Sequence, residues 1–111
     1  MRYLFLRYED ERAEVSAAVR DALNEACLSN DQTLRERGYL VEAGHLSHDI
    51  ITVQFVNDQL TLTTEPLAAA PQPPTSFCLI QARDLNEAIH IAARMPQVRR
   101  GRIVIRPSSE Q

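Results

Sequence analysis

Residues 75–107 read TSFCLIQARDLNEAIHIAARMPQVRRGRIVIRP and decide the fold. The apolar run 77–82 predicts a strand. Asp84 followed by Glu87 is a variant of the capping box and predicts the start of a helix. Pro96 ends this helix, because proline cannot continue its hydrogen bonds, and residues 101–107 return as a strand. We therefore predict a strand–helix–strand unit whose two strands run parallel and are covered on one side by the helix.

The first part of the chain supplies a strand and a helical region. Residues 3–6 are apolar on both faces, which is typical of a central strand. Residues 29–31 read as a break with a fresh N-cap at Asp31, so residues 11–37 form either one helix or two. Gly38 stands where a left-handed residue closes a helix. The buried stripe predicted from helical spacing consists of Val15, Ala18, Val19, Ala22, Leu23 and Ala26.

A β-hairpin is predicted in the middle of the chain. Residues 50–56 and the return strand 60–64 both alternate between apolar and polar side chains. Asn57-Asp58 between them is typical of a tight turn. A short extended segment, residues 39–41, precedes the hairpin. Residues 65–74 follow it as a loop, because the four prolines there cannot donate hydrogen bonds to a strand ladder.

The order of these elements predicts one domain over residues 1–111. The helices cover one sheet face only, so we predict an α+β, ferredoxin-like fold with a mixed sheet and both helices on one side. The other face is expected to carry Leu4, Leu6 and Ile80. Contiguous exposed apolar area marks an interface. We therefore expect a homodimer whose two sheets face each other and enclose a cleft.

Composition and charge narrow the class of protein. A net charge of −3 without a basic stripe argues against nucleic-acid binding. The first apolar run is too short for a membrane span, so we expect a cytoplasmic protein. Cys27 and Cys78 are expected to be reduced and mostly buried, with a disulfide or redox pair as the alternative. The sequence has no phosphate-binding glycine loop, nucleophile elbow or zinc-type cysteine pair, and we expect neither a metal nor a cofactor.

The chain resembles the YCII-related family, and within it the branch named after an Asp-Gly-Pro-Phe motif. Residues 1–6, 34–41, 63–67, 76–80 and 84–107 carry the resemblance, which covers nearly the whole chain. It implies a ferredoxin-like monomer that pairs into a dimeric α/β barrel with a polar cleft. Most members have no assigned activity. A few are similar to small-molecule lyases or dehydrochlorinases that use a His–Asp pair.

Two departures from this family pattern concern the residues that would carry catalysis. Thr64-Glu65-Pro66-Leu67 stands where the motif reads Asp-Gly-Pro-Phe, so the motif carboxylate is missing at its place and Glu65 is its substitute candidate. The first-helix histidine of the lyase-like members has no counterpart in residues 15–28. The candidate acid–base residues therefore lie elsewhere in the chain.

Residues 42–49 hold the cluster best suited to acid–base chemistry, namely His45, His48 and Asp49 with Glu42 nearby. A histidine oriented by a carboxylate can act as a general base. His45 and His48 can also bind zinc, but a structural zinc site takes four ligands and only two or three are close in sequence. The alternative is a solvated polar loop between strands.

A second group of polar residues lies on or beside the predicted strands, and some of them are expected to face the cleft. Arginines there can hold a carboxylate through two hydrogen bonds. The alternative is that these residues lie at strand ends and meet solvent or the partner subunit. His90 is expected on the exposed face of the last helix. The candidate ligand-binding residues are Arg7, Gln54, Thr63, Thr64 and Arg106.

Three functions fit these observations. The first is a homodimer that binds a small polar molecule in its cleft. The second is a lyase-like or dehydrochlorinase-like enzyme that uses His45 or His48 with Asp49 or Glu65, for which a histidine within hydrogen-bonding reach of a carboxylate is the test. The third is a structural or regulatory dimer without a ligand.

Overall fold

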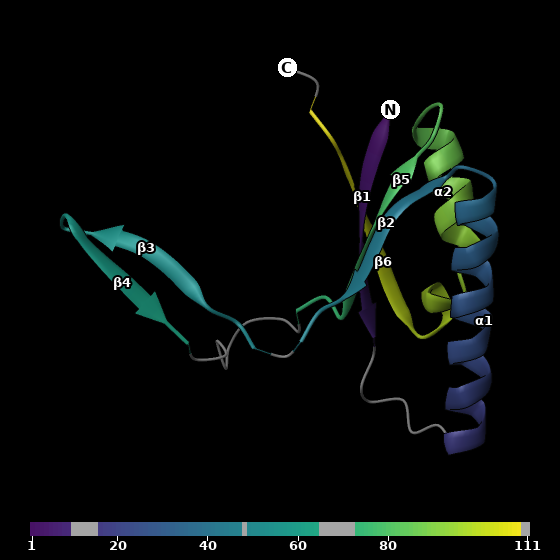
Figure 1. The fold of residues 1–111 in the computed structure, drawn as a ribbon, viewed down its shortest axis with the longest axis horizontal. Coiled ribbons are helices and arrows are strands. Elements are labelled where there is room, and N and C mark those ends of the chain that lie inside the picture. Colours follow the sequence, from purple (N-terminus) through teal and green to yellow (C-terminus); the bar gives the residue numbers. More distant parts are fainter. Residues whose placement is uncertain (10–15, 48, 65–72, 110–111) are drawn as a thin grey trace.

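The computed structural model describes residues 1–9, 16–47, 49–64 and 73–109. A four-stranded sheet carries both α-helices on one side, and a two-stranded hairpin projects from the other side (Figure 1). This arrangement confirms the predicted α+β, ferredoxin-like fold. None of the described helices is long and apolar enough to cross a membrane. The elements are β1 (Arg2–Glu9), α1 (Ala17–Glu36), β2 (Leu40–His45), β3 (Thr52–Val56), β4 (Gln59–Thr63), β5 (Ser76–Gln81), α2 (Leu85–Ala93), the 3₁₀-helix η1 (Pro96–Arg99) and β6 (Gly101–Pro107).

The main sheet has the strand order β2-β5-β1-β6, and every neighbouring pair in it is antiparallel. β5 and β6 run parallel, as predicted, but β1 lies between them and pairs with both. The strands joined through a helix, β1 with β2 and β5 with β6, are each separated by one intervening strand. No two parallel strands are therefore neighbours, and the expectation of a mixed sheet is wrong. β1 is an inner strand, as its apolar pattern predicted.

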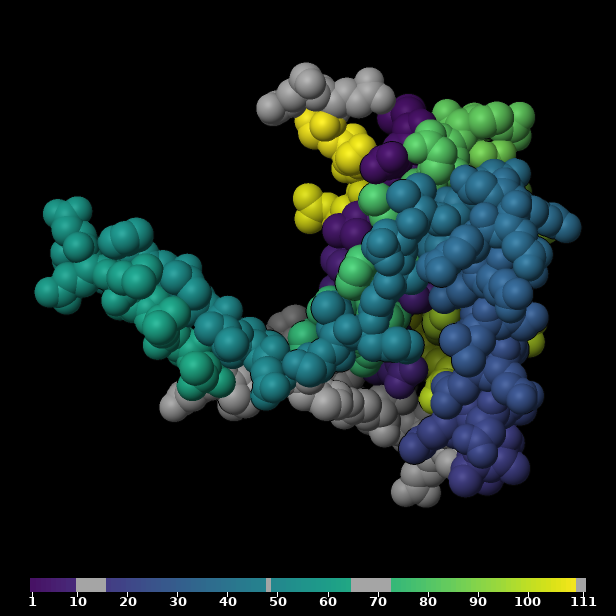
Figure 2. Space-filling model, in the orientation of Figure 1, coloured from purple at the N-terminus to yellow at the C-terminus, as the bar shows by residue number. Residues whose placement is uncertain are grey.

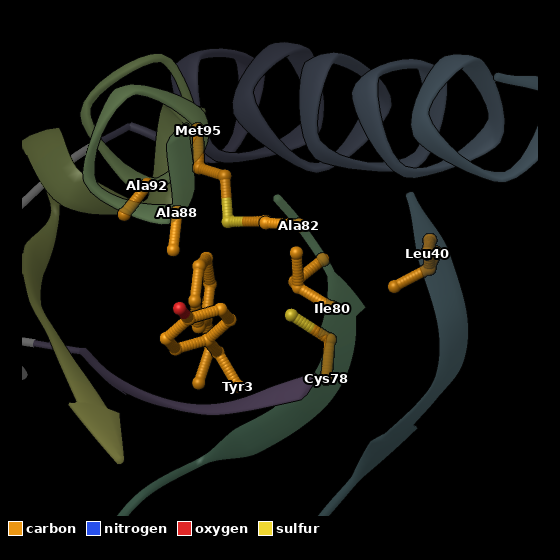
Figure 3. Close-up of a cluster of buried hydrophobic side chains, with 9 residues drawn as sticks. Tyr3, Leu40, Cys78, Ile80, Ala82, Ala88, Ala92 and Met95 are labelled. Carbon is orange, nitrogen blue, oxygen red and sulfur yellow. The ribbon is translucent and has the colours of Figure 1, made fainter. Parts of the chain in front are cut away.

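The core lies between the main sheet and the helices (Figure 3). Tyr3 and Phe5 of β1 point toward the helices and are fully buried together with Ile80 of β5. Ile80 was expected on the opposite face. It lies opposite Tyr3 in the antiparallel register, and directly opposed side chains share one face of a sheet. The buried cluster consists of Tyr3, Phe5, Leu40, Cys78, Ile80, Ala82, Ala88, Ala92 and Met95.

The other face of the main sheet, called the open face below, is apolar at its centre. Leu4 lies opposite Leu79, and Leu6 lies between Phe77 on β5 and Val104 on β6. These five side chains define the open face, and all of them are half-buried within the single chain. The expectation that Leu4 and Leu6 point away from the helices is confirmed.

α1 is one continuous helix, which answers the question that the sequence left open. Ser16 caps it by accepting a hydrogen bond from the amide of Val19, and Gly38 follows it with a φ of 82°. The predicted buried stripe is wrong: Ala18, Val19, Ala22 and Ala26 are exposed, and Val15 lies outside the described residues. Alanines have little side chain to bury, so they do not determine which face turns inward. The half-buried side chains are Leu23, Cys27, Asn30, Asp31 and Leu34.

The predicted hairpin is confirmed. Asn57 and Asp58 have φ values of 51° and 62°, as a type I′ turn requires. Residues 52–63, called the hairpin arm below, form a separate two-stranded sheet that extends away from the helices (Figures 1 and 2). The register pairs four apolar side chains across the strands, so they share one face of the arm: Val53 with Leu62, and Phe55 with Leu60.

Candidate functional site

A pocket of about 450 Å³ opens between α1 and the neighbouring ends of β1, β2 and β5, and it is called the α1 pocket below. Small-molecule sites have volumes of roughly 300–1,000 Å³. The α1 pocket lies on the helix side of the sheet, whereas the cleft was expected at the open face. Its lining comprises Arg7, Glu9, Asn24, Cys27, Leu28, Asp31, His45, Leu46, Thr75, Ser76 and Gln97.

Arg7 is the buried charge of the α1 pocket. It continues the alternation of Tyr3 and Phe5 along β1, so its side chain points toward the helices, and it is only 3% exposed. Its Nε donates to Ser76 Oγ at 2.8 Å, and its Nη1 donates to the two carboxylate oxygens of Asp31 at 3.2 and 3.3 Å. A buried charge is tolerated when it is paired and hydrogen-bonded. These contacts therefore hold the guanidinium in a fixed position.

Asp31 is the carboxylate that faces Arg7. The prediction that Asp31 caps a new helix is wrong, because α1 continues through this position and the side chain pairs with Arg7 instead. The Asp31 side chain is 20% exposed. A carboxylate has about four acceptor positions. Asp31 therefore keeps acceptor capacity beyond its hydrogen bonds with Arg7.

His45 brings an imidazole to the same pocket. It lies at the end of β2, directly opposite Ser76 of β5, and the strand includes it although the sequence predicted an irregular segment there. The α1 pocket is thus lined by a histidine from β2 and a carboxylate from α1. These are the residue types of general acid–base chemistry. The carboxylate in this pocket is Asp31, whereas the sequence suggested Asp49.

Two further side chains characterise the chemistry of the α1 pocket. Burial raises the pKa of the Cys27 thiol, so little of it is thiolate at neutral pH and it is a weak nucleophile. The Oε1 atom of Gln97, from η1, is buried without a hydrogen-bond donor. Buried acceptors normally have a partner, but this atom has almost no surface that a bound molecule could reach. Among the described residues, no three His, Cys, Asp or Glu side chains gather as a metal site requires.

Glu42 and Asp49, the other acid–base candidates among the described residues, do not line the α1 pocket. Asp49 is exposed, and its backbone amide donates to the hydroxyl of Ser47. Glu42 is exposed on β2, and its carboxylate accepts a hydrogen bond from the amide of Ala43. His48 and Glu65 lie outside the described residues. Of the three acid–base candidates that the structure describes, His45 lines the pocket, and Glu42 and Asp49 do not.

The candidate ligand-binding residues are divided among three places. Arg7 lies in the α1 pocket. Gln54 and Thr63 lie on the hairpin arm, Thr64 directly follows it, and all three are exposed. Arg106 is exposed on β6 and lies opposite Leu4, on the side of the open face. The structure does not bring these five residues together.

Asp31, Cys27 and Ser76 line the pocket but were not among the residues predicted from the sequence. A signal was present for the first two. Cys27, Asp31 and Leu34 recur at spacings of four and three residues, which places them on one helix face. A carboxylate on the inward face of a helix requires a cationic partner, and Arg7 lies on the inward face of β1.

A second groove, of about 540 Å³, lies between α1 and α2. His90 lines it and is exposed, as the sequence predicted. The groove is larger than the α1 pocket, but none of its lining residues is buried. Arg83, for example, is 82% exposed and pairs with Glu87 at 2.8 Å. We therefore take the α1 pocket, with its buried charge, as the candidate site.

Comparison with known proteins identifies the family. The model of the YCII-related domain matches residues 1–110. The fold is similar to 5-chloro-2-hydroxyhydroquinone dehydrochlorinase from Burkholderia phenoliruptrix AC1100, solved in complex with 2,5-dihydroxybenzoquinone. The TM-score is 0.58 and the identity 16%, over 100% of this chain and 96% of that chain. No curated protein matches significantly. Membership of the Asp-Gly-Pro-Phe branch stays a prediction. The match over residues 1–110 shows that the chain belongs to the YCII-related family.

Proposed function

We propose that this protein binds a small polar molecule in the α1 pocket. The observation that carries the proposal is the buried Arg7, which Asp31 and Ser76 hold beside the pocket. Arginine is almost never fully buried without a partner. A concave pocket with a few convergent polar groups is the usual form of a small-molecule site.

The polar groups of the α1 pocket indicate the chemistry of the ligand. Asp31 accepts hydrogen bonds, while His45 and the hydroxyl of Ser76 can donate them. A complementary ligand carries both hydroxyl groups and carbonyl or carboxylate oxygens. The 2,5-dihydroxybenzoquinone bound by the structurally similar dehydrochlorinase is a single ring of this kind. We therefore propose small oxygenated rings as the ligand class.

Isothermal titration with a panel of single-ring quinones, phenols and carboxylates, beginning with 2,5-dihydroxybenzoquinone, tests this proposal. His45→Gln removes an exposed imidazole of the pocket, and His90→Gln removes an exposed imidazole outside it as the matched control. We expect His45→Gln to weaken binding about tenfold, as the loss of one hydrogen bond does, and His90→Gln to leave it unchanged. Absence of binding across the panel, or equal losses in both variants, contradicts the proposal.

A second candidate function is acid–base catalysis, since His45 and Asp31 line the same pocket, although no hydrogen bond or ion pair joins these two side chains. In an elimination, His45 takes a proton from the substrate and the leaving group departs with its bonding electrons, while Asp31 accepts a hydrogen bond from a substrate hydroxyl. Chloride release from 5-chloro-2-hydroxyhydroquinone tests this reaction, with Asp31→Asn and His45→Gln expected to reduce it at least about 100-fold. Binding without chloride release would leave the first function standing alone.

We further propose a homodimer that buries the open face. Its five half-buried apolar side chains form a contiguous surface of the kind that marks an interface. Light scattering at micromolar concentration is expected to give twice the chain mass of 12.6 kDa. A dimer without any ligand would match the structural alternative. We place the protein in the cytoplasm, where Cys27 and Cys78, both free in the structure, stay reduced.

A further inference from the structure

The hairpin arm is an apolar surface that the chain itself leaves uncovered. The exposed fractions of Val53, Phe55, Leu60 and Leu62 lie between 58% and 74%. All four share one face, and the opposite face presents Thr52, Gln54, Thr61 and Thr63. A two-stranded hairpin is marginally stable in water unless its apolar face packs against something. The arm therefore has the pattern of an element whose apolar face is buried against a partner and whose polar face meets water.

The exposed apolar area of the hairpin arm fits a contact with a partner. The four apolar side chains of one arm account for roughly 150–300 Å² of apolar area, taking about 60–120 Å² for each fully exposed side chain. Two exchanged arms would add substantially to an interface between open faces.

The arm projects from the same side of the main sheet as the open face (Figure 1), and it leaves a deep recess beside the sheet (Figure 2). A second molecule stacked on the open face comes within reach of this arm. Two-fold symmetry makes the contact reciprocal, so each arm reaches the other copy. The charge of the arm argues against an anionic membrane, since residues 50–64 contain Asp58 and no Lys or Arg.

We propose that a second copy of the chain covers this apolar surface. The hairpin arm packs against that copy through Val53, Phe55, Leu60 and Leu62. The inference rests on the homodimer proposed above and adds the segment that secures it. The arm then serves as a clamp between the copies, and its polar face stays in contact with water.

Sedimentation equilibrium of two matched variants tests this inference. Phe55→Ser/Leu60→Ser removes one cross-strand pair from the apolar face, and Gln54→Ser/Thr61→Ser removes the neighbouring pair from the polar face. We expect the first variant to raise the dimer Kd at least about 100-fold and the second to change it less than about threefold. Circular dichroism should show the main domain intact in both, because these side chains lie outside the core.

The other outcomes separate the two proposals. A dimer whose Kd is the same in all three proteins overturns the role of the arm and leaves the homodimer standing. Equal weakening by both variants also overturns it, since the apolar face would then have no special part. A wild-type monomer overturns the arm and the homodimer together, and binding of that monomer to lipid vesicles would assign the arm to a membrane surface. The pocket proposal is independent of all these results.

Discussion

Replacing Asp31 by alanine is the most direct test of how the α1 pocket is built. The substitution removes the carboxylate that meets Arg7 Nη1 at 3.2 Å, and the Arg7 side chain, which is only 4% exposed, loses this partner. Removing one partner of a buried ion pair costs about 3–5 kcal/mol. Because the Asp31 side chain is 20% exposed, water can partly replace it, and we expect a loss of about 3 kcal/mol in the free energy of unfolding.

The pair between Arg83 and Glu87 provides the control. Its atoms lie closer, at 2.8 Å, but Arg83 is 82% exposed and the two residues are four positions apart at the start of α2. Exposed pairs contribute about 0–1 kcal/mol, because water screens the charges and the side chains lose entropy. Arg83→Ala should therefore cost less than about 1 kcal/mol. We therefore expect Asp31→Ala to cost more stability than Arg83→Ala, because the Arg7–Asp31 pair is buried, although its atoms lie farther apart.

Urea unfolding at one fixed protein concentration measures both losses and avoids a shift caused by subunit dissociation. The double variant Arg7→Met/Asp31→Leu removes both charges and is expected to lie within about 1 kcal/mol of the wild type, since apolar replacement of a buried pair is often neutral or better. The reasoning is refuted if Asp31→Ala costs less than Arg83→Ala. It is also refuted if the double variant is less stable than Asp31→Ala alone.

Three further outcomes are expected. Iodoacetamide should alkylate Cys27, half-buried in the α1 pocket, faster than the buried Cys78, and a bound ligand should slow the reaction at Cys27, as peptide mass spectrometry would show. Burial raises the pKa of Cys78 from its ordinary 9.0 to about 12, so its folded thiol retains a proton that the unfolded thiol loses. The unfolding free energy should fall by up to about 1.4 kcal/mol per pH unit between these values, and urea titrations of Cys78→Ala should lack this contribution. Gly101→Ala should cost more than about 2 kcal/mol in the same assay, because its Cβ would collide with the backbone carbonyl of Tyr8 and force β6 away from β1.

Local chemistry made much of the fold predictable from the sequence. Asn57 and Asp58 take the positive φ values that a tight hairpin turn requires. The Asp84 carboxylate accepts a hydrogen bond from the backbone amide of Glu87, as the capping pattern indicated. These features depend on residues that are neighbours in the chain. The central position of β1 followed from its apolar pattern for the same reason.

The candidate site was less predictable because it depends on residues that are distant in sequence. Arg7 was recognised as a candidate, but its partners Asp31 and Ser76 follow 24 and 69 positions later. The rotation of α1 decides whether Asp31 meets Arg7, and the alanines of the predicted stripe carry too little apolar surface to fix that rotation. The Arg7–Asp31 pair and Leu34 mark the inward face instead.

The position of β1 between β5 and β6 has a consequence for biosynthesis. β1 is synthesised well before both strands that pair with it, which lie within residues 76–107. Until those residues emerge, the nascent chain carries an unpaired apolar strand and an apolar hairpin. Contacts between such distant segments slow folding, and unpaired strands are prone to aggregate. Chaperone dependence should therefore end abruptly once β6 has emerged from the ribosome, a point that ribosome-stalled chains with C-terminal linkers of increasing length would locate.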